Sequence, residues 1–225
     1  MEETKRKPGT APASSQEKVV NAAFKMIDEQ GYAKFSIRAL AEQLGIGTMS
    51  VYTYVPSKKQ LLFLVLAKMR QEIDNRPIAG EYWEDTLHRV CESIRDNSLE
   101  HARIRFMQMQ TQIAWPMEHN RSTYLLHTDQ GIPHNVYHPM WSTMRAFLSG
   151  FIDREVTELC TTQASGEDPF GNGDWAAIRN DSAGEKRFHE GLDMIIAGTK
   201  ALPGAEGWQT WHTPENPADW TWGKE

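Results

Sequence analysis

The tightest constraint on the fold is a pair of short helical segments, separated by glycines, within residues 36–58. Ser36 is a favourable N-cap, apolar residues then recur at helical spacing, and Gly45 ends the first segment after two turns. The second segment begins at about Gly47 and stops at Pro56. Two short helices joined by a glycine turn predict a helix-turn-helix unit.

A further helix is predicted on each side of this unit. Ser14, with a glutamate three residues later, has the spacing of a capping box, and Gly31 can take the left-handed conformation that ends a helix. Ser57 has the same spacing to a glutamine and opens a longer helix. We therefore assign residues 15–57 to a helix-turn-helix domain and about 58–75 to a helix that links this domain to the rest of the chain.

The two short helices divide their side chains between a core and an outer surface. The apolar residues predicted to form the shared core are Leu40, Leu44, Ile46, Val51 and Val55. The residues predicted to lie largely on the outer side of the second helix are Gly47, Thr48, Met49, Ser50, Tyr52, Thr53 and Tyr54. A polar, aromatic and uncharged surface of this size fits the major groove of DNA, where side chains reach base edges.

Cationic and hydroxyl-bearing residues around this surface are predicted to contact DNA phosphates. Lys58 lies in the first turn of the linking helix, where exposed backbone amides also attract a phosphate. Ser36 and Arg38 occupy the equivalent first turn of the first short helix. Lys34 and Lys59 are expected to add longer-range attraction.

The charge of the chain is distributed unevenly. Residues 1–70 contain 11 Lys and Arg against 6 Asp and Glu, a net charge of +5, whereas residues 71–225 contain 13 against 24, a net charge of −11. This contrast indicates that the N-terminal part meets a polyanion and that the rest does not. The acidic remainder argues against a protein that compacts DNA nonspecifically, because such binding depends on neutralising phosphates.

The rest of the chain predicts more helices and no sheet, so the expected fold class is all-α. Helical spacing of apolar residues recurs at about 82–98, 101–112, 120–130, 135–163 and 185–201. The remaining expected segments are a flexible arm at 1–14, a larger helical domain at 76–202 containing a surface loop at 164–184, and an irregular Trp- and Pro-rich tail at 203–225 that is either packed on the body or disordered. For the basic residues of the arm, a solubilising role and a role in tracking DNA both stay open.

The expected location is the cytoplasm, with no membrane partner. No apolar run approaches ~18 residues, the length of a membrane-spanning helix, and the polar N-terminus lacks the apolar segment of a secretory signal. Cys91 and Cys160 are too few for a disulfide framework or a multi-cysteine zinc site, and they are expected to be buried small hydrophobes.

The sequence from Ile37 to Lys58, IRALAEQLGIGTMSVYTYVPSK, resembles the DNA-binding domain of TetR-family transcriptional repressors, and the resemblance extends over about 15–75. It implies that Tyr52 and Lys58 form a phosphate-binding pair. The further positions that match base- or phosphate-contacting positions of the family are Arg38, Thr48, Met49, Ser50 and Thr53. Val51 stands where the family usually has Leu and Tyr54 where it often has His, and the second change bears on the choice of operator.

The run from Phe188 to Gly198, FHEGLDMIIAG, resembles the last helix of the tetracycline-repressor type of C-terminal domain. The resemblance implies that this helix and the long one before it form a four-helix bundle with a second copy, and that this domain binds a ligand. The apolar positions that either join such an interface or belong to the core are Phe147, Phe151, Leu192, Ile195 and Ile196.

Methionine and aromatic residues between residues 94 and 144 have two interpretations. One is an ordinary packed core, and the other is a cavity with pliable and flat apolar walls for a small molecule. The candidate ligand-binding residues are Ile94, Phe106, Met107, Met109, Trp115, Met117, His138, Trp141 and Met144.

The predicted function is a homodimeric transcriptional repressor that binds a palindromic double-stranded DNA operator and is released by a small-molecule effector. No phosphate loop, nucleophile elbow or zinc-protease motif is present, so we expect neither an enzyme nor a cofactor. An activator of the same fold, or a regulator that answers to a protein partner, stays open as an alternative. A remote alternative is a metal-dependent enzyme that uses His134 and His138, although Pro133 and Pro139 bracket this pair and no metal site is expected.

Overall fold

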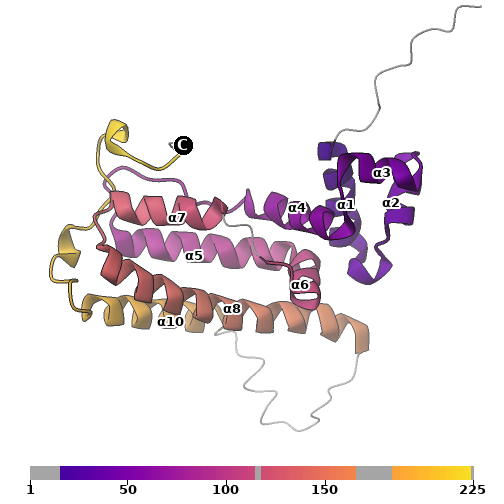
Figure 1. Ribbon diagram of the computed structural model, residues 1–225. Coiled ribbons are helices and arrows are strands. Elements are labelled where there is room, and N and C mark those ends of the chain that lie inside the picture. The colour runs from indigo at the N-terminus through magenta and orange to yellow at the C-terminus, as the bar shows by residue number, and fades with distance from the viewer. Residues whose placement is uncertain (1–15, 115–117, 166–183, 224–225) are drawn as a thin grey trace, which may run out of the picture.

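The protein, described by a computed structural model, is helical and elongated, with a small helical head at one end of a longer helical body (Figure 1). The described residues are 16–114, 118–165 and 184–223. Within these ranges the structure contains no β-strand beyond one isolated bridge, so the all-α fold class is confirmed. None of the described helices combines the length and apolar character needed to cross a membrane.

The head and its link to the body follow the predicted order of elements. The helices are α1 (Gln16–Gln30), α2 (Ile37–Leu44), α3 (Thr48–Tyr54) and α4 (Lys58–Arg70), with a short 3-10 turn η1 (Tyr32–Lys34) after α1. The hydroxyl of Ser36 accepts a hydrogen bond from the Ala39 amide at 3.1 Å, and Gly45 ends α2 in the left-handed conformation. Ser57 caps α4 in the same way, accepting from the Gln60 amide at 3.1 Å. The predicted Ser14 cap lies outside the described residues.

The body is built around one long helix, α8. Its helices are α5 (Trp83–Glu100), α6 (Ala102–Thr111), α7 (Glu118–Asp129), α8 (His134–Ser165) and α10 (Gly184–Lys200). α8 packs against α5, α6 and α10, and α10 runs back along it (Figure 1). The predicted helices at 82–98, 101–112, 120–130, 135–163 and 185–201 are confirmed to within two residues at each end. Most of the predicted 164–184 loop, and the 1–14 arm, lie outside the described residues.

Two hydrophobic clusters hold the molecule together. The first contains residues of the four helices α1, α2, α3 and α4. It extends into the body through Ile104, Met107 and Ile113. The second fills the body around Trp83, Met144 and the inner faces of α5, α7, α8 and α10. α6 therefore supplies core residues to the head, so the head is seated on the body through apolar contact.

The tail after α10 packs on the body, which decides between the two predicted alternatives. Trp211 lies edge-on against Trp83, with ring centroids 5.6 Å apart. The Gly80 amide donates to the Thr213 carbonyl at 2.9 Å, and the Thr213 amide donates to the Glu81 carbonyl at 2.8 Å. These contacts fold the tail over the connection between α4 and α5, with the short 3-10 turns η2 (Trp208–Thr210) and η3 (Pro217–Asp219) as its only regular structure among residues 201–223.

Candidate nucleic-acid interface and ligand cavities

The angle between α2 and α3 is set by a small apolar core. Leu40, Val51 and Val55 are fully buried, and Leu44 and Ile46 are half-buried against the same cluster. Because α3 has only two turns, this core fixes its orientation and presents its other side to solvent. The predicted division between core and surface is confirmed for these five residues.

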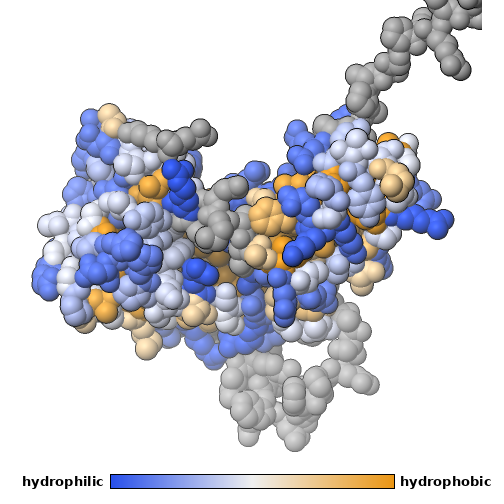
Figure 2. All heavy atoms as spheres, in the orientation of Figure 1, coloured by the Kyte–Doolittle hydropathy of each residue, from blue (hydrophilic) through white to orange (hydrophobic). Residues whose placement is uncertain are grey.

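The outer side of α3 carries neutral side chains. Thr48, Ser50 and Thr53 are exposed, the Met49 side chain is 78% exposed, and Tyr52 is 38% exposed. Figure 2 shows hydrophilic and apolar residues interspersed over the head. Hydroxyl groups that donate and accept, next to an exposed apolar side chain, match the chemistry of base edges in a major groove.

Tyr54 departs from the predicted surface. It is half-buried and packs against the core of the head, while its carbonyl accepts a hydrogen bond from the Gln16 side chain at 3.1 Å. The reason is helical spacing, since Tyr54 follows the buried Val51 by three residues and so lies on the same face. The prediction that Tyr54 lies largely on the outer side of α3 is therefore wrong.

The predicted phosphate-binding residues lie at the starts of α2 and α4. Lys58 begins α4, and its ammonium lies 4.7 Å from the centroid of the Tyr32 ring and 5.5 Å from that of Phe35. These rings hold the cation in place by cation–π attraction. Sequence reasoning missed the two aromatic residues, although their position directly before α2 was a visible signal. Arg38 is exposed in the first turn of α2.

The head is joined to the body by a buried histidine. His101, between α5 and α6, is only 8% exposed and lies 3.0 Å from a carboxylate oxygen of Asp28 on one side and 3.0 Å from one of Glu72 on the other. Burial lowers the pKa of His101, but the hydrogen bonds and charges of Glu72 and Asp28 more than offset this, so the net pKa is raised above 6.5. The Asn97 side chain also donates to the Met69 carbonyl at 3.0 Å, which anchors the end of α4.

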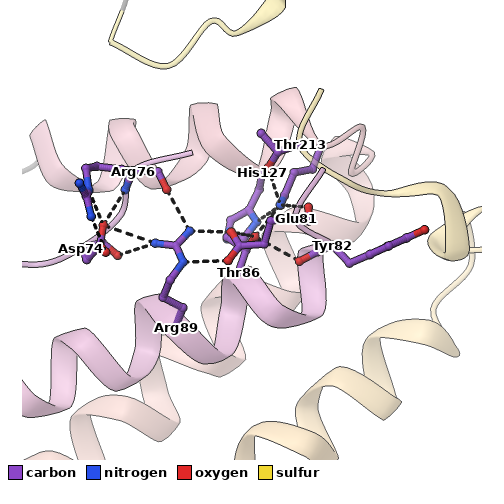
Figure 3. Close-up of polar contacts among 9 residues, drawn as sticks. Asp74, Arg76, Glu81, Tyr82, Thr86, Arg89, His127 and Thr213 are labelled. Atoms are coloured by element: carbon purple, nitrogen blue, oxygen red, sulfur yellow. Dashed lines mark hydrogen bonds and ion pairs between the residues drawn. The ribbon is translucent and has the colours of Figure 1, made fainter. Parts of the chain in front are cut away.

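The connection between α4 and α5 is held by one arginine (Figure 3). Arg89 donates to both carboxylate oxygens of Glu81, at 2.8 and 2.6 Å, and to the backbone carbonyls of Asp74 and Arg76. The bidentate geometry is the strong form of this pairing. The residues after α4 are thereby fixed to α5.

A second set of polar contacts lies next to this arginine and reaches the tail (Figure 3). Gln130 donates to the hydroxyls of Thr86 and Thr213, at 2.6 and 3.1 Å, and it hydrogen-bonds His127 at 3.0 Å. Burial lowers the pKa of His127 to about 4, so its ring is neutral near pH 7. These buried groups connect α5, α7 and the tail, although the Nε2 atom of His127 has no hydrogen-bond partner among the described residues.

Two cavities adjoin the candidate ligand-binding residues. A groove of about 520 Å³ lies between the head and the body and is lined by Phe106 among others. A smaller cavity of about 90 Å³, enclosed by the end of α4 and by α5, α6 and α8, is lined by Ile94 and Trp141. Its remaining lining residues, which sequence reasoning did not select, are Met69, Arg70, Ile73, Ser98, Arg105, Arg145, Leu148, Ser149 and Ile152.

The other candidate ligand-binding residues lie elsewhere. Met107 and Met144 are fully buried in the two hydrophobic clusters, and Met109 is half-buried against the body cluster. His138 is exposed, and its ring nitrogen lies 2.8 Å from that of His134. The remaining candidates, Trp115 and Met117, are outside the described residues.

The candidate interface residues divide into two groups. Leu192 is fully buried and Ile196 is 6% exposed, so both face the core of their own chain, while Ile195 is half-buried. Phe147 and Phe151 are half-buried, and a Cβ added at Gly191 would lie 2.4 Å from the Phe147 ring. α10 therefore packs closely on α8, as α-helices do where one residue is glycine.

Comparison with known proteins places the head in a family. Residues 19–65 match the family described as bacterial regulatory proteins, tetR family. Among curated relatives, the transcriptional repressor DrrR1 of Streptomyces coeruleorubidus is 38% identical over 81 residues, which are 35% of this chain and 30% of that protein. The chain thus matches about a third of the length of such relatives.

Solved structures extend the similarity to the body. The TetR family protein ActR of Streptomyces coelicolor, in complex with actinorhodin, has a TM-score of 0.63 at 23% identity over 87% of this chain and 99% of that one. BioQ with its double-stranded DNA operator has a TM-score of 0.58 at 19% identity over 84% and 99%. At these identities the similarity shows a shared fold. The N-terminal domain is therefore similar to that of the tetR family of bacterial regulatory proteins, and the whole chain shares its fold with solved members of that family.

Proposed function

We propose that this protein is a transcriptional repressor that binds a palindromic DNA operator as a homodimer and is released by a small-molecule effector. The observation that carries the proposal is the outer side of α3, where neutral hydroxyl and apolar side chains are exposed, together with cations at the starts of the two neighbouring helices. Lys58 stands at the start of α4 and Arg38 at the start of α2. Cations that flank a neutral surface suit a helix that reads bases while its neighbours hold phosphates.

The proposed dimer uses α8 and α10. A helix-turn-helix head reads paired half-sites when two copies are related by a two-fold axis. The outward side of α10 offers Met194, whose side chain is 77% exposed, next to the exposed Ala197 and Gly198. A carboxylate in the centre of this surface would be buried on association, so Met194→Asp is expected to shift the protein to monomers in sedimentation analysis.

The proposed release depends on α4, which belongs to both parts of the molecule. Its first turn carries Lys58, whereas its last turn is anchored to the body through Asn97 and is followed by the Glu72–His101 contact. A ligand that favours one position of this last turn would favour one spacing of the two heads. Release by a ligand, and repression itself, are supported by the relatives, since DrrR1 is named a repressor and ActR has been solved with actinorhodin.

A binding selection on random duplex DNA, at about 0.1–0.15 M salt, tests the proposal. We expect an inverted repeat whose half-sites lie on one face of the duplex, with centres about 10 base pairs or a multiple apart. Met49→Asp places a carboxylate on the exposed side of α3 and should abolish enrichment, whereas Ile78→Asp, at another exposed position, should not. A folded dimer that enriches no sequence, or enrichment that survives Met49→Asp, would contradict the proposal.

A further inference from the structure

The small cavity at the end of α4 has a cationic wall. Arg70 is the last residue of α4, Arg105 lies on α6 and Arg145 on α8, and all three line the cavity. None of the lining residues that the structure describes is an Asp or a Glu. Three guanidinium groups from three helices thus converge on one space of about 90 Å³.

The proximity of the three arginines is electrostatically unfavourable. Burial, followed by repulsion from Arg105 and Arg145, lowers the pKa of Arg70 to about 10. Arg105 is 4% exposed, pairs with Asp153 and hydrogen-bonds Gln108 at 3.0 Å, so it is held in position. An anion between the three groups would reduce this repulsion in a partly buried site, where charges interact more strongly than in water.

A second observation at the same cavity points to a ligand that accepts hydrogen bonds. Trp141 is 7% exposed and lines the cavity, and its indole nitrogen Nε1 has no hydrogen-bond partner among the described residues. Buried indole N–H groups usually have a partner, because an unsatisfied donor costs about 1–3 kcal/mol. The hydroxyl-bearing Ser149, which is exposed, adds a further donor to the lining.

Apart from Ser98, the rest of the lining is apolar, and it favours a ligand whose charged group is attached to a hydrocarbon part. Its apolar members are Met69, Ile73, Ile94, Leu148 and Ile152. The cavity is smaller than the 300–1,000 Å³ typical of sites for drug-sized ligands. Its volume suits a small ligand with a single charged group and a compact hydrocarbon part.

We propose that this cavity binds a small organic carboxylate, whose charged group is held by Arg70, Arg105 and Arg145 and whose hydrocarbon part lies on the apolar wall. Its regulatory consequence rests on the proposed function: the carboxylate ties the last turn of α4 to α6 and α8 and so selects one position of the DNA-binding head. Carboxylate–guanidinium pairing supplies both affinity and orientation. A neutral molecule of the same shape lacks this pairing.

Calorimetric titration with three carboxylates and their amides tests the chemistry. The probes are benzoate, phenylacetate and hexanoate, each compared with the amide of the same carbon skeleton. We expect at least one carboxylate to bind at least 10-fold more tightly than its amide. Equal binding of every acid and its amide, or no binding by any of the three acids, would overturn the proposal.

Three variants locate the binding. Arg145→Gln removes an exposed arginine of the lining, so the fold should persist, and it is expected to weaken carboxylate binding at least 10-fold. Arg154→Gln removes an equally exposed arginine of the same helix outside the lining and should change binding less than 2-fold. In NMR spectra, the indole N–H signal of Trp141 is identified by its loss in Trp141→Phe. Its chemical shift should change on addition of the carboxylate, and an unchanged chemical shift would contradict this site.

The same samples separate this inference from the proposed function. Sequence-specific DNA binding by a protein that ignores all three carboxylates would overturn the inference and leave the repressor proposal intact. Carboxylate binding at the arginines by a protein that enriches no DNA sequence would overturn the repressor proposal and leave the carboxylate site intact. Carboxylate binding that leaves DNA affinity unchanged would overturn only the regulatory consequence.

Discussion

The head and the body of this protein use charged and polar side chains in opposite ways. In the head, the residues proposed to act are exposed around α3, as with Thr48, Ser50 and Arg38. In the body, the notable polar groups are buried between helices, as with His101, His127 and Arg105. The comparison teaches that the head presents its proposed functional groups on a surface that folding leaves open, whereas the polar groups of the body meet only once distant segments have packed.

The largest expected effect lies in the body core. Trp83 is fully buried and meets Trp211 of the tail, so Trp83→Ala should leave a cavity and loosen the tail. We expect a loss of about 3–5 kcal/mol in the free energy of unfolding, measured by urea titration. Trp220→Ala, at a half-buried position of the tail, is the control and should cost clearly less. Similar losses in both variants would contradict the ranking of these two sites.

The junction between head and body should respond to pH. The raised pKa of His101 means that its contribution to stability is complete below about pH 6.5 and is lost as the pH rises through the folded-state value. His101→Gln should therefore cost about 1–3 kcal/mol of unfolding free energy at pH 6 and less at pH 9. The exposed His138→Gln is the control. A cost that does not change with pH would mean that the charge of His101 contributes nothing.

A change on the outer side of α3 should affect DNA and spare the fold. Thr48→Ala removes an exposed hydroxyl, so stability should change by less than about 0.5 kcal/mol. The preference among operator variants should change by about 1–2 kcal/mol at the base pairs that Thr48 contacts. Competition binding with single-base operator variants measures this preference. Uniform weakening across all variants would instead place Thr48 on the phosphate backbone.

The smallest expected effect is loss of one phosphate contact. Lys58→Ala should weaken binding to all DNA sequences to a similar extent and reduce the slope of log affinity against log salt by about 1. Lys25→Ala on α1, where the lysine pairs with Glu29, is the matched control because it removes the same charge. An unchanged salt slope in Lys58→Ala would show that the cation over Tyr32 and Phe35 does not contact phosphate.

Most of the head was predictable from the sequence because its signals are local. Caps at Ser36 and Ser57, and the left-handed Gly45, act within one or two turns, so their effect appears directly in the sequence. Tyr54 was misplaced because the two-turn helix carries few apolar residues from which to judge its inner face. Tyr54 follows the buried Val51 by three residues, and this spacing places it on the inner face of α3.

The body was predictable as a set of helices but not as a site. Leu192 and Phe147 share an apolar pattern, which does not distinguish packing within one chain from packing against a second copy. For Met107 and Met144 the sequence left both a packed core and a cavity wall open, and both side chains are fully buried in the hydrophobic clusters. Composition indicates an apolar interior without indicating where that interior is empty.

The sequence by itself determined the all-α class, the order of the helices with their approximate ends, and most of the surface of α3, since each depends on interactions between residues close together in the chain. Only the tertiary structure decided that Arg70, Arg105 and Arg145 meet in one cavity, because they lie 35 and 40 positions apart in the chain and on three different helices. It also decided that His101 contacts Asp28 and Glu72, residues 73 and 29 positions away. Contacts over such separations arise from packing, which no local pattern encodes.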